Sequence, residues 1–275
     1  MVLEYDDILK HRGGILNNDF TKKISLNHFE TSAKTKSKYY DTDGLGLFLQ
    51  KHKNKLTILS LNIASLHSKC NDLKQLVNEL AEKEHYISII CIQEAGIKKN
   101  SDASHLQLQN YRLITQSLTK NCCTKGGLAI YVLDKIEVKN VNNYNIYSTW
   151  EGISIDITDS NNNAIRLLNM YRPGRNNNNH ASIERFLEDF RPINKEVTKS
   201  AKNLILTGDF NIDLLKINSN ERFQDFYDLL TGLNLIPIIT FPTRTSKNKA
   251  TLIDHIYGKT YSPLTLSRRP LWKSF

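Results

Sequence analysis

Single polar side chains end or interrupt several short apolar stretches of this chain of 275 residues. Each alone has an ordinary explanation, because an asparagine can cap a turn and a buried carboxylate can simply accept backbone hydrogen bonds. Together they form a pattern, since strand ends that meet at one rim of a sheet bring their side chains close to one another. The residues of this pattern are Asn62, Glu94, Tyr171, Asp209, Asn211 and Asp254.

These side chains offer oxygen ligands, and the pattern contains neither a cysteine nor a pair of histidines. Such ligands favour a hard cation, Mg²⁺ or Mn²⁺, which typically takes one or two carboxylates together with water and a substrate phosphate. A cation of this kind stabilises charge on a phosphoryl group during its transfer, while a carboxylate and a carboxamide position the attacking water. The pattern therefore predicts cleavage of a phosphate ester.

Short apolar strands and a few amphipathic helices must position these residues. The sequence predicts strands within residues 56–62, 87–92, 111–116, 128–133, 152–158, 165–171, 204–206 and 251–257. Helical spacing marks residues 66–80, 183–190 and 223–230, and Pro192 is expected to end the second of these helices. The asparagine tracts 140–145 and 176–179 are interpreted as surface loops. We expect an α/β fold with two packed mixed β-sheets and outer helices, a four-layer α/β sandwich.

The composition narrows the class of protein and of partner. Lysine and arginine exceed aspartate and glutamate by 37 − 28 = 9, which suits nucleic acid or an acidic membrane surface, although many proteins without such a partner share this balance. No stretch is apolar for the roughly 18 residues that a membrane span requires, and the first residues lack the pattern of a signal peptide. We therefore expect a soluble, intracellular protein. Its four cysteines include no C-x-x-C pair, so neither a disulfide framework nor a structural zinc is expected.

Seven motifs resemble the endonuclease/exonuclease/phosphatase superfamily, and their wording is most similar to the endonuclease domain of non-LTR (LINE-type, jockey-like) retrotransposons. They occur in order: SLN ending at Asn62, IQE ending at Glu94, GGLAIYV from Gly126, YRPG from Tyr171, GDFNIDLL from Gly208, FPTRT from Phe241 and TLIDHIY from Thr251. The resemblance covers about residues 55–258. We divide the chain into a polar, partly disordered leader (1–54), a domain of this superfamily (55–260) and an atypical C-terminal tail (261–275).

The resemblance implies a role for each polar residue. Glu94 looks like the principal metal ligand, with Asn62 beside it binding a water of the metal or a phosphate. Asp209 and Asn211 match the pair that positions the attacking water and supports the phosphate in the transition state. Tyr171 matches a phenol that contacts the scissile phosphate.

Further site residues lie near the C-terminal end of the domain. Thr240 aligns with a threonine that supports the site, and Thr243 is a competing choice. Asp254 matches the carboxylate that orients a catalytic histidine, which in this superfamily comes from a Ser-Asp-His motif on a later strand. The residues after Tyr257 contain no such motif, so we expect a C-terminally truncated fold. His255 is a poor substitute, because neighbouring residues on a strand point to opposite faces.

The leading hypothesis for function is a Mg²⁺-dependent DNA endonuclease domain that nicks its target and leaves a 3′-hydroxyl for reverse transcription. The resemblance implies a reverse transcriptase downstream in a full-length element, and a nuclear location if the chain is functional. Arg172, Arg175 and Arg244 are predicted to contact DNA phosphates, although a solvated basic face would look the same in sequence.

Two other functions stay open. A truncated copy that lacks the histidine could be a catalytically dead remnant that at most binds nucleic acid. The same fold could instead hydrolyse a phosphoinositide or a sphingolipid headgroup, since a fold does not fix a substrate. Substitution of Glu94 separates the dead remnant from the enzyme, because a charge-driven binder keeps its affinity when a negative charge is removed.

Overall fold

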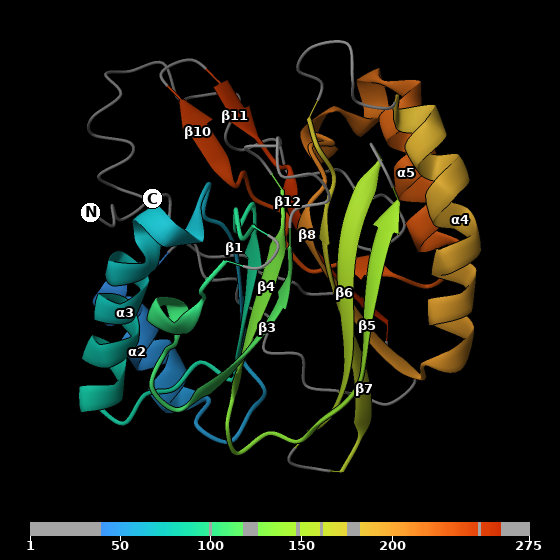
Figure 1. Ribbon diagram of the computed structural model, residues 1–275. Coiled ribbons are helices and arrows are strands. Elements are labelled where there is room, and N and C mark those ends of the chain that lie inside the picture. Colours follow the sequence, from blue (N-terminus) through green and yellow to red (C-terminus); the bar gives the residue numbers. More distant parts are fainter. Residues whose placement is uncertain are drawn as a thin grey trace.

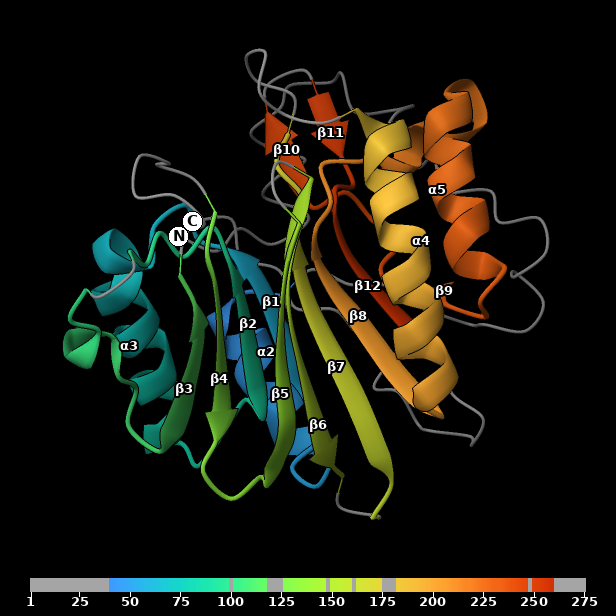
Figure 2. The same cartoon turned by 45° about the vertical axis from the view of Figure 1, so that its right-hand side comes forward.

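The protein is built from two β-sheets that pack face to face, with helices covering the outer face of each sheet (Figure 1 and Figure 2). The computed structural model describes residues 40–98, 101–117, 126–146, 149–159, 162–174, 182–246 and 249–259. Within these residues the layers follow the order helices, sheet, sheet, helices. The predicted α/β class with two mixed sheets and outer helices is confirmed. The predicted C-terminal truncation concerns residues outside this range.

The first sheet has the strand order β1-β2-β4-β3. Its strands are β1 (Ile58–Asn62), β2 (Ile89–Gln93), β3 (Tyr111–Gln116) and β4 (Leu128–Leu133). Strands β1 and β2 are parallel, because helix α3 (Leu66–Glu82) carries the chain back along the sheet between them. The other pairs are antiparallel, and a short 3-10 helix, η1 (Ser104–Leu106), precedes β3.

The second sheet has the strand order β5-β6-β7-β8-β12-β9. Its strands are β5 (Val138–Ile146), β6 (Trp150–Thr158), β7 (Ala164–Tyr171), β8 (Asn203–Asp209), β9 (Ile236–Pro237) and β12 (Asp254–Lys259). Helix α4 (Ile183–Ser200) joins the parallel strands β7 and β8, and α5 (Glu221–Thr231) follows the short helix η2 (Leu214–Ser219). A separate antiparallel pair, β10 (Arg244–Ser246) and β11 (Lys249–Thr251), comes before β12.

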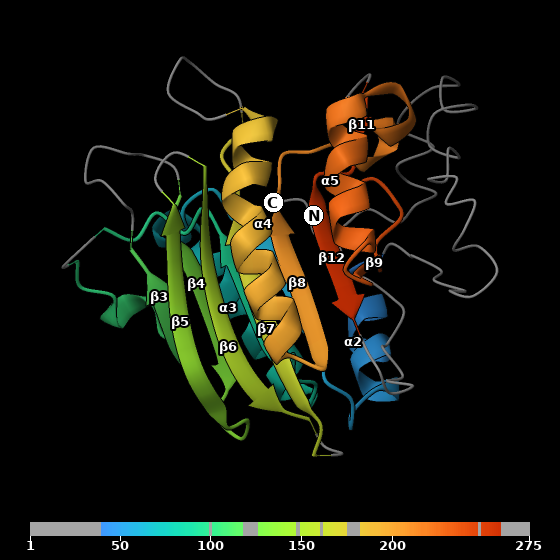
Figure 3. The same ribbon diagram turned by 90° about the vertical axis from the view of Figure 1, so that its right-hand side faces the viewer.

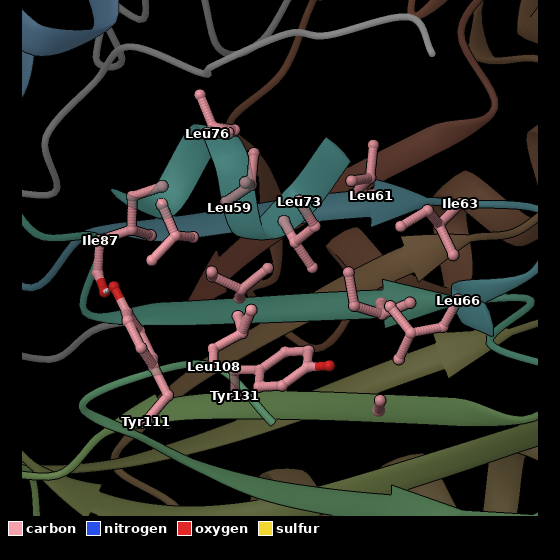
Figure 4. Packing of buried hydrophobic residues seen from close by; sticks show 14 of the residues in the cluster. Leu59, Leu61, Ile63, Leu66, Leu73, Leu76, Ile87, Leu108, Tyr111 and Tyr131 are labelled. Carbon is pink, nitrogen blue, oxygen red and sulfur yellow. Dashed lines mark hydrogen bonds between the residues drawn. The ribbon is translucent and has the colours of Figure 1, made fainter. Parts of the chain in front are cut away.

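Apolar side chains fill the spaces between all four layers. Strand β4 is buried along its whole length, as expected for a strand that is covered on both faces. On the first sheet, Leu66 and Leu73 of α3 pack in one cluster with Leu61 of β1 and Tyr131 of β4 (Figure 4). On the second sheet, α4 and α5 lie side by side over an aromatic cluster (Figure 3). Its rings are those of Phe186, Phe190, Phe210, Phe226 and Tyr257.

One expectation about the leader needs correction. Helix α2 (Thr42–Lys51) lies inside the segment predicted to be a polar leader, and it buries Leu45, Phe48 and Leu49 in the same cluster as α3. Asp41 caps this helix by accepting a hydrogen bond of 2.7 Å from the Gly44 amide. The spacing i, i+3, i+4 of the three apolar residues is helical, but it spans little more than one turn and therefore gives a weak signal. Residues 1–39 lie outside the described range.

The predicted end of the second helix was also wrong. Helix α4 contains Pro192 and continues to Ser200. The missing amide of a proline weakens a helix, but the turn after it buries Val197 and partly buries Ile193 against the second sheet. Tertiary packing thus outweighs the local preference of proline.

Two further expectations differ from the structure. The tract 140–145, interpreted as a surface loop, lies in the edge strand β5. Its side chains are mostly exposed, so the sequence has neither the apolar run nor the alternation of polar and apolar residues that indicates a strand. The tract 176–179 lies outside the described residues. The single strand expected over 251–257 is split into β11 and β12, because the Leu252 amide donates to the Asp213 carboxylate and its carbonyl accepts from the Leu214 amide. Among the described residues, no helix has the length and apolar character that a membrane crossing requires.

Candidate active site

Five strand ends place their polar residues at one rim shared by both sheets. Asn62 ends β1, and Glu94 directly follows β2. Tyr171 and Asp209 end the parallel strands β7 and β8 and are partners in their register. Asp254 opens the antiparallel strand β12 and is the register partner of Asp209. Because parallel strands end at the same edge, the topology itself brings these residues together.

The side chain of Asn62 connects the two sheets. Its Nδ2 atom donates to Glu94 Oε1 at 2.7 Å and to Asp209 Oδ2 at 2.7 Å. Its Oδ1 atom accepts from the Ala64 amide at 3.1 Å, which fixes the orientation of the carboxamide. A carboxylate of each sheet is thereby held against one amide group.

Glu94 and Asn211 both have left-handed backbone conformations, with φ of 51° and 50°. Such conformations are uncommon for residues other than glycine and persist where the surroundings hold them. After Glu94, the Ala95 amide donates to the Gly127 carbonyl at 2.9 Å. The Asn211 amide donates to Asp209 Oδ1 at 2.9 Å, and Asn211 Nδ2 donates to the Arg172 carbonyl at 2.8 Å. Both turns are thus fixed by hydrogen bonds rather than by glycine.

Asp209 is completely buried and accepts hydrogen bonds on both oxygens. Its Oδ2 atom accepts from Asn62 and, at 2.6 Å, from Nη2 of Arg244. Burial, and next the charge of Asp254, raise the pKa of Asp209 to about 7. The pKa of Asp254 is also raised, chiefly because burial disfavours its charged form.

The threonine that contacts Asp254 is Thr243. Its hydroxyl donates to Asp254 Oδ2 at 2.6 Å and accepts from the Asp254 amide at 3.2 Å. Thr243 is the alternative to Thr240 that the sequence offered for the supporting threonine. The role predicted for Thr240 stays a prediction. Nη2 of Arg244 lies 3.5 Å from Asp254 Oδ1, so one guanidinium approaches both aspartates.

Tyr171 is buried beneath this group of carboxylates. Only 2% of its surface is exposed, and its phenol lies close enough to the Glu94 and Asp209 carboxylates to feel their charge. Burial, together with the charges of Glu94 and Asp209, raises the pKa of Tyr171 and keeps it protonated as a donor.

Sequence reasoning missed three buried polar residues under the rim. Glu151, the register partner of Tyr171, accepts from the Gly127 amide at 2.7 Å and so supports the loop that holds Ala95. Gln93 donates to Asn169 Oδ1 at 2.6 Å, and Asn169 Nδ2 donates to the Ile92 and Ala129 carbonyls. The only available signal was a polar residue inside an otherwise apolar strand.

The predictions for the three arginines expected to contact DNA have different outcomes. The prediction that Arg172 contacts DNA was wrong. Arg172 is 4% exposed, donates to the Phe210 carbonyl at 3.3 Å and lies over the Phe186 ring. It therefore supports the loop after β8 instead of facing DNA. Arg175 lies outside the described residues. Arg244 reaches the site itself, with 44% of its side chain exposed.

His255 lies on the other face of β12 from Asp254. It is 2% exposed, stacks on Phe210 with ring centroids 5.0 Å apart, and its Nε2 lies 3.0 Å from the Leu252 carbonyl. It belongs to the core under α5 and does not reach the carboxylates.

The donor set suits a divalent cation that takes few protein ligands. Glu94, Asp209 and Asp254 interact with one guanidinium, that of Arg244, so full ionisation leaves an excess of 3 − 1 = 2 negative charges. The described residues contain no cluster of three or more His, Cys, Asp or Glu side chains arranged to hold a metal. Mg²⁺ is commonly bound by one or two carboxylates, with water and substrate phosphate completing its shell. Glu94, with Asn62 beside it, would hold such an ion.

The chain thus combines two packed β-sheets, outer helices and a rim lined by carboxylates. The chain belongs to the endonuclease/exonuclease/phosphatase family, whose model matches residues 59–274. This match runs past the last described residue. A sequence search of curated proteins gave no match.

Several solved structures share the fold at low sequence identity. A 3′-phosphatase from Neisseria, NExo, bound to a product DNA hairpin, is 18% identical with a TM-score of 0.57, over 74% of this chain and 86% of that chain. The AP endonuclease LMAP from Leishmania major is 11% identical with a TM-score of 0.56, over 75% and 80%. The human Nocturnin catalytic domain is 16% identical with a TM-score of 0.54, over 77% and 84%. At these identities the likeness establishes the fold alone.

Proposed function

We propose that this chain is a Mg²⁺-dependent (or Mn²⁺-dependent) DNA endonuclease that hydrolyses one phosphodiester bond and leaves a nick with a 3′-hydroxyl. The observation that carries the proposal is Asn62, which holds Glu94 and Asp209 at 2.7 Å on the same nitrogen. Glu94, the carboxylate proposed to bind the metal, therefore lies beside Asp209, the carboxylate proposed to activate water. Two of the similar structures are DNA enzymes by their names, and one was solved with a DNA product.

Asp209 is suited to position the attacking water. A carboxylate has about four lone-pair sites, and the amides of Asn62 and Asn211 with the Arg244 guanidinium occupy three of them. The remaining site can accept a proton from the water as its oxygen bonds to phosphorus. The bond from phosphorus to O3′ breaks, and the leaving oxygen takes a proton from solvent. The products are a 3′-hydroxyl and a 5′-phosphate.

The other residues hold the phosphate and the metal. When bound, Mg²⁺ supplies positive charge that stabilises the transferring phosphoryl group. Tyr171 presents a protonated phenol next to Glu94 and can donate to a phosphate oxygen. Asn211 supports the phosphate from the neighbouring loop, in the role that the family motif implies.

We further propose that the chain is the endonuclease domain of a retrotransposon-type protein. The wording of the YRPG and FPTRT motifs supports this assignment. This assignment implies that target DNA is the substrate and that a reverse transcriptase encoded downstream is the partner. It also implies that the protein acts in the nucleus.

Nicking of supercoiled plasmid tests the proposal. With Mg²⁺, the unmodified chain is expected to convert the plasmid to the open circle, and a DNA polymerase is expected to extend the nick from its 3′-hydroxyl. Glu94→Ala is expected to lower the rate by about 10²-fold or more, because it removes the metal-binding carboxylate. Glu82→Ala, on an exposed position at the end of α3, is the matched control and keeps the rate. Nicking that resists both EDTA and Glu94→Ala contradicts the proposal.

A second candidate, a catalytically inactive nucleic-acid binder, is favoured by the burial of His255 away from the carboxylates. In that case neither the unmodified chain nor Glu94→Ala nicks plasmid, while both bind DNA equally well. A chain extended with a Ser-Asp-His strand then shows whether the other site residues are competent. Release of phosphate from phosphoinositides without nicking would indicate the lipid-directed alternative.

A further inference from the structure

The backbone that carries Arg244 is firmly held beside the carboxylates. The Thr243 amide donates to the Thr251 carbonyl at 2.8 Å, and Arg244 pairs with Thr251 in the β10-β11 register. The Thr243 hydroxyl is bonded to the Asp254 side chain and amide. The start of the arginine side chain is therefore fixed relative to β12.

One side of the Arg244 guanidinium faces two carboxylates, and the other side faces solvent. Its Nη2 atom contacts Asp209 Oδ2 at 2.6 Å and lies 3.5 Å from Asp254 Oδ1, and these carboxylates are 0% and 14% exposed. The arginine side chain itself is 44% exposed. Since a guanidinium carries five N–H donors in one plane, the contact through Nη2 leaves other donors directed elsewhere.

We propose that Arg244 is a catalytic residue that binds the scissile phosphate through the solvent-facing part of its guanidinium and stabilises the charge that develops on it. The inference rests on the proposed function and names the residue that supplies the fixed positive charge. Arg244 shares Asp209 Oδ2 with Asn62, so it lies one hydrogen bond from the group that positions the water. The free lone pair of Asp209 is on Oδ1, in the carboxylate whose Oδ2 accepts from Arg244, so a phosphate attacked by a water on Oδ1 can reach the solvent-facing part of this guanidinium.

The chemistry of arginine suits this role. Its planar fork matches two phosphate oxygens, and the group stays charged at any pH at which the protein is folded. Unlike a histidine, it transfers no proton, so it acts by charge alone. The fully buried Asp209 and the largely buried Asp254 orient the fork and keep it from turning into solvent.

The test compares Arg244→Gln and Arg244→Lys with Arg112→Gln. Arg112 is an exposed residue of β3 at the end of the sheet opposite Glu94, and its replacement changes the net charge equally. Single-site nicking of an oligonucleotide duplex in Mg²⁺ is expected to show kcat lowered about 10²- to 10³-fold for Arg244→Gln, with a much smaller rise in KM. Millimolar guanidinium chloride is expected to restore part of this rate in Arg244→Gln and to leave the Arg112→Gln rate unchanged. Arg244→Lys is expected to keep more activity than Arg244→Gln.

A binding measurement does not depend on turnover. The affinity for a 5′-phosphorylated tetranucleotide is compared with that for the same tetranucleotide without the phosphate. The unmodified chain and Arg112→Gln are expected to prefer the phosphorylated form at least tenfold, and Arg244→Gln to lose that preference.

The outcomes separate the two proposals. A nicking enzyme whose kcat and phosphate preference survive Arg244→Gln overturns the role of Arg244 and leaves the proposed function standing. If the unmodified chain does not nick DNA, the proposed function fails and the catalytic role of Arg244 fails with it, and the tetranucleotide preference decides whether Arg244 binds a phosphate. A rise in KM with unchanged kcat reduces Arg244 to ground-state binding and overturns the catalytic assignment.

Discussion

Asp209 and Asp254 face each other directly across the antiparallel strands β8 and β12; the first is fully buried and the second largely buried. Like charges placed directly opposite in a sheet destabilise it, and here they are held together by one guanidinium and the Thr243 hydroxyl. The rim thus keeps two carboxylates close at the expense of stability, a common property of sites that bind cations.

Asp254→Asn should therefore stabilise the fold while lowering activity. The amide oxygen can still accept from Thr243, and the repulsion of Asp209 is removed. We expect the free energy of unfolding at pH 7.5 to rise by about 1 kcal/mol and nicking to fall about 10²-fold or more. Urea unfolding and plasmid nicking measure the two effects. Loss of stability in this variant would show that the carboxylate pair is not a source of strain.

Mg²⁺ should stabilise the protein through Glu94. A ligand that binds only the native state adds about 2.7 kcal/mol at a concentration of 100 times its Kd. We expect Mg²⁺ to raise the melting temperature of the unmodified chain and of Glu82→Gln, and to leave that of Glu94→Gln unchanged. Thermal unfolding at constant ionic strength measures the shift. An equal shift in all three proteins would point to a cation site elsewhere.

Acid should destabilise the protein through His255. Burial lowers the pKa of His255 to about 4, below its ordinary value of 6.5. Between these values the unfolded chain binds a proton that the native protein does not, so stability falls as the pH falls from about 6.5 to about 4. We expect this histidine to account for a loss of about 3 kcal/mol. The pH dependence of urea unfolding should be flatter in His255→Phe than in the unmodified chain, and an equal pH dependence in both proteins would contradict this role of His255.

Arg172→Ala should act on stability. Its guanidinium lies over Phe186 and donates to the Phe210 carbonyl, so its removal leaves a buried acceptor without that partner. We expect a loss of about 2 kcal/mol in the free energy of unfolding. DNA affinity measured well below the melting temperature should fall no more than in Arg112→Gln. A large loss of affinity with unchanged stability would restore the original prediction that this residue contacts DNA.

The sequence was informative where strands are buried on both faces. Short continuous apolar runs such as Leu128–Leu133 favour a strand covered on both faces, and a polar residue at the end of such a run indicates the rim of a sheet. Asn62, Glu94 and Asp209 could be grouped for that reason alone. Their oxygen ligands indicated phosphate-ester chemistry, and the motifs then indicated the endonuclease/exonuclease/phosphatase superfamily, which the fold and the family match support.

The remaining features depend on tertiary geometry that no local pattern encodes. Strand β5 is mostly exposed and only three of its side chains, those of Val138, Tyr144 and Ile146, are partly buried, because it lies at the edge of its sheet. Whether Thr240 or Thr243 touches Asp254 depends on the path of the chain before β10. The burial of Arg172 depends on where α4 places Phe186. In each case residues distant in the sequence decide the outcome.

The hydrogen bond between Asn62 and Asp209 joins positions that are 147 residues apart. Closing a loop of that length carries an entropic penalty that only a docked pair of sheets can offset. We therefore expect helices such as α3 to form early during folding and the reaction centre to assemble late. During synthesis on the ribosome, the five strand ends cannot meet until Asp254 has left the exit tunnel.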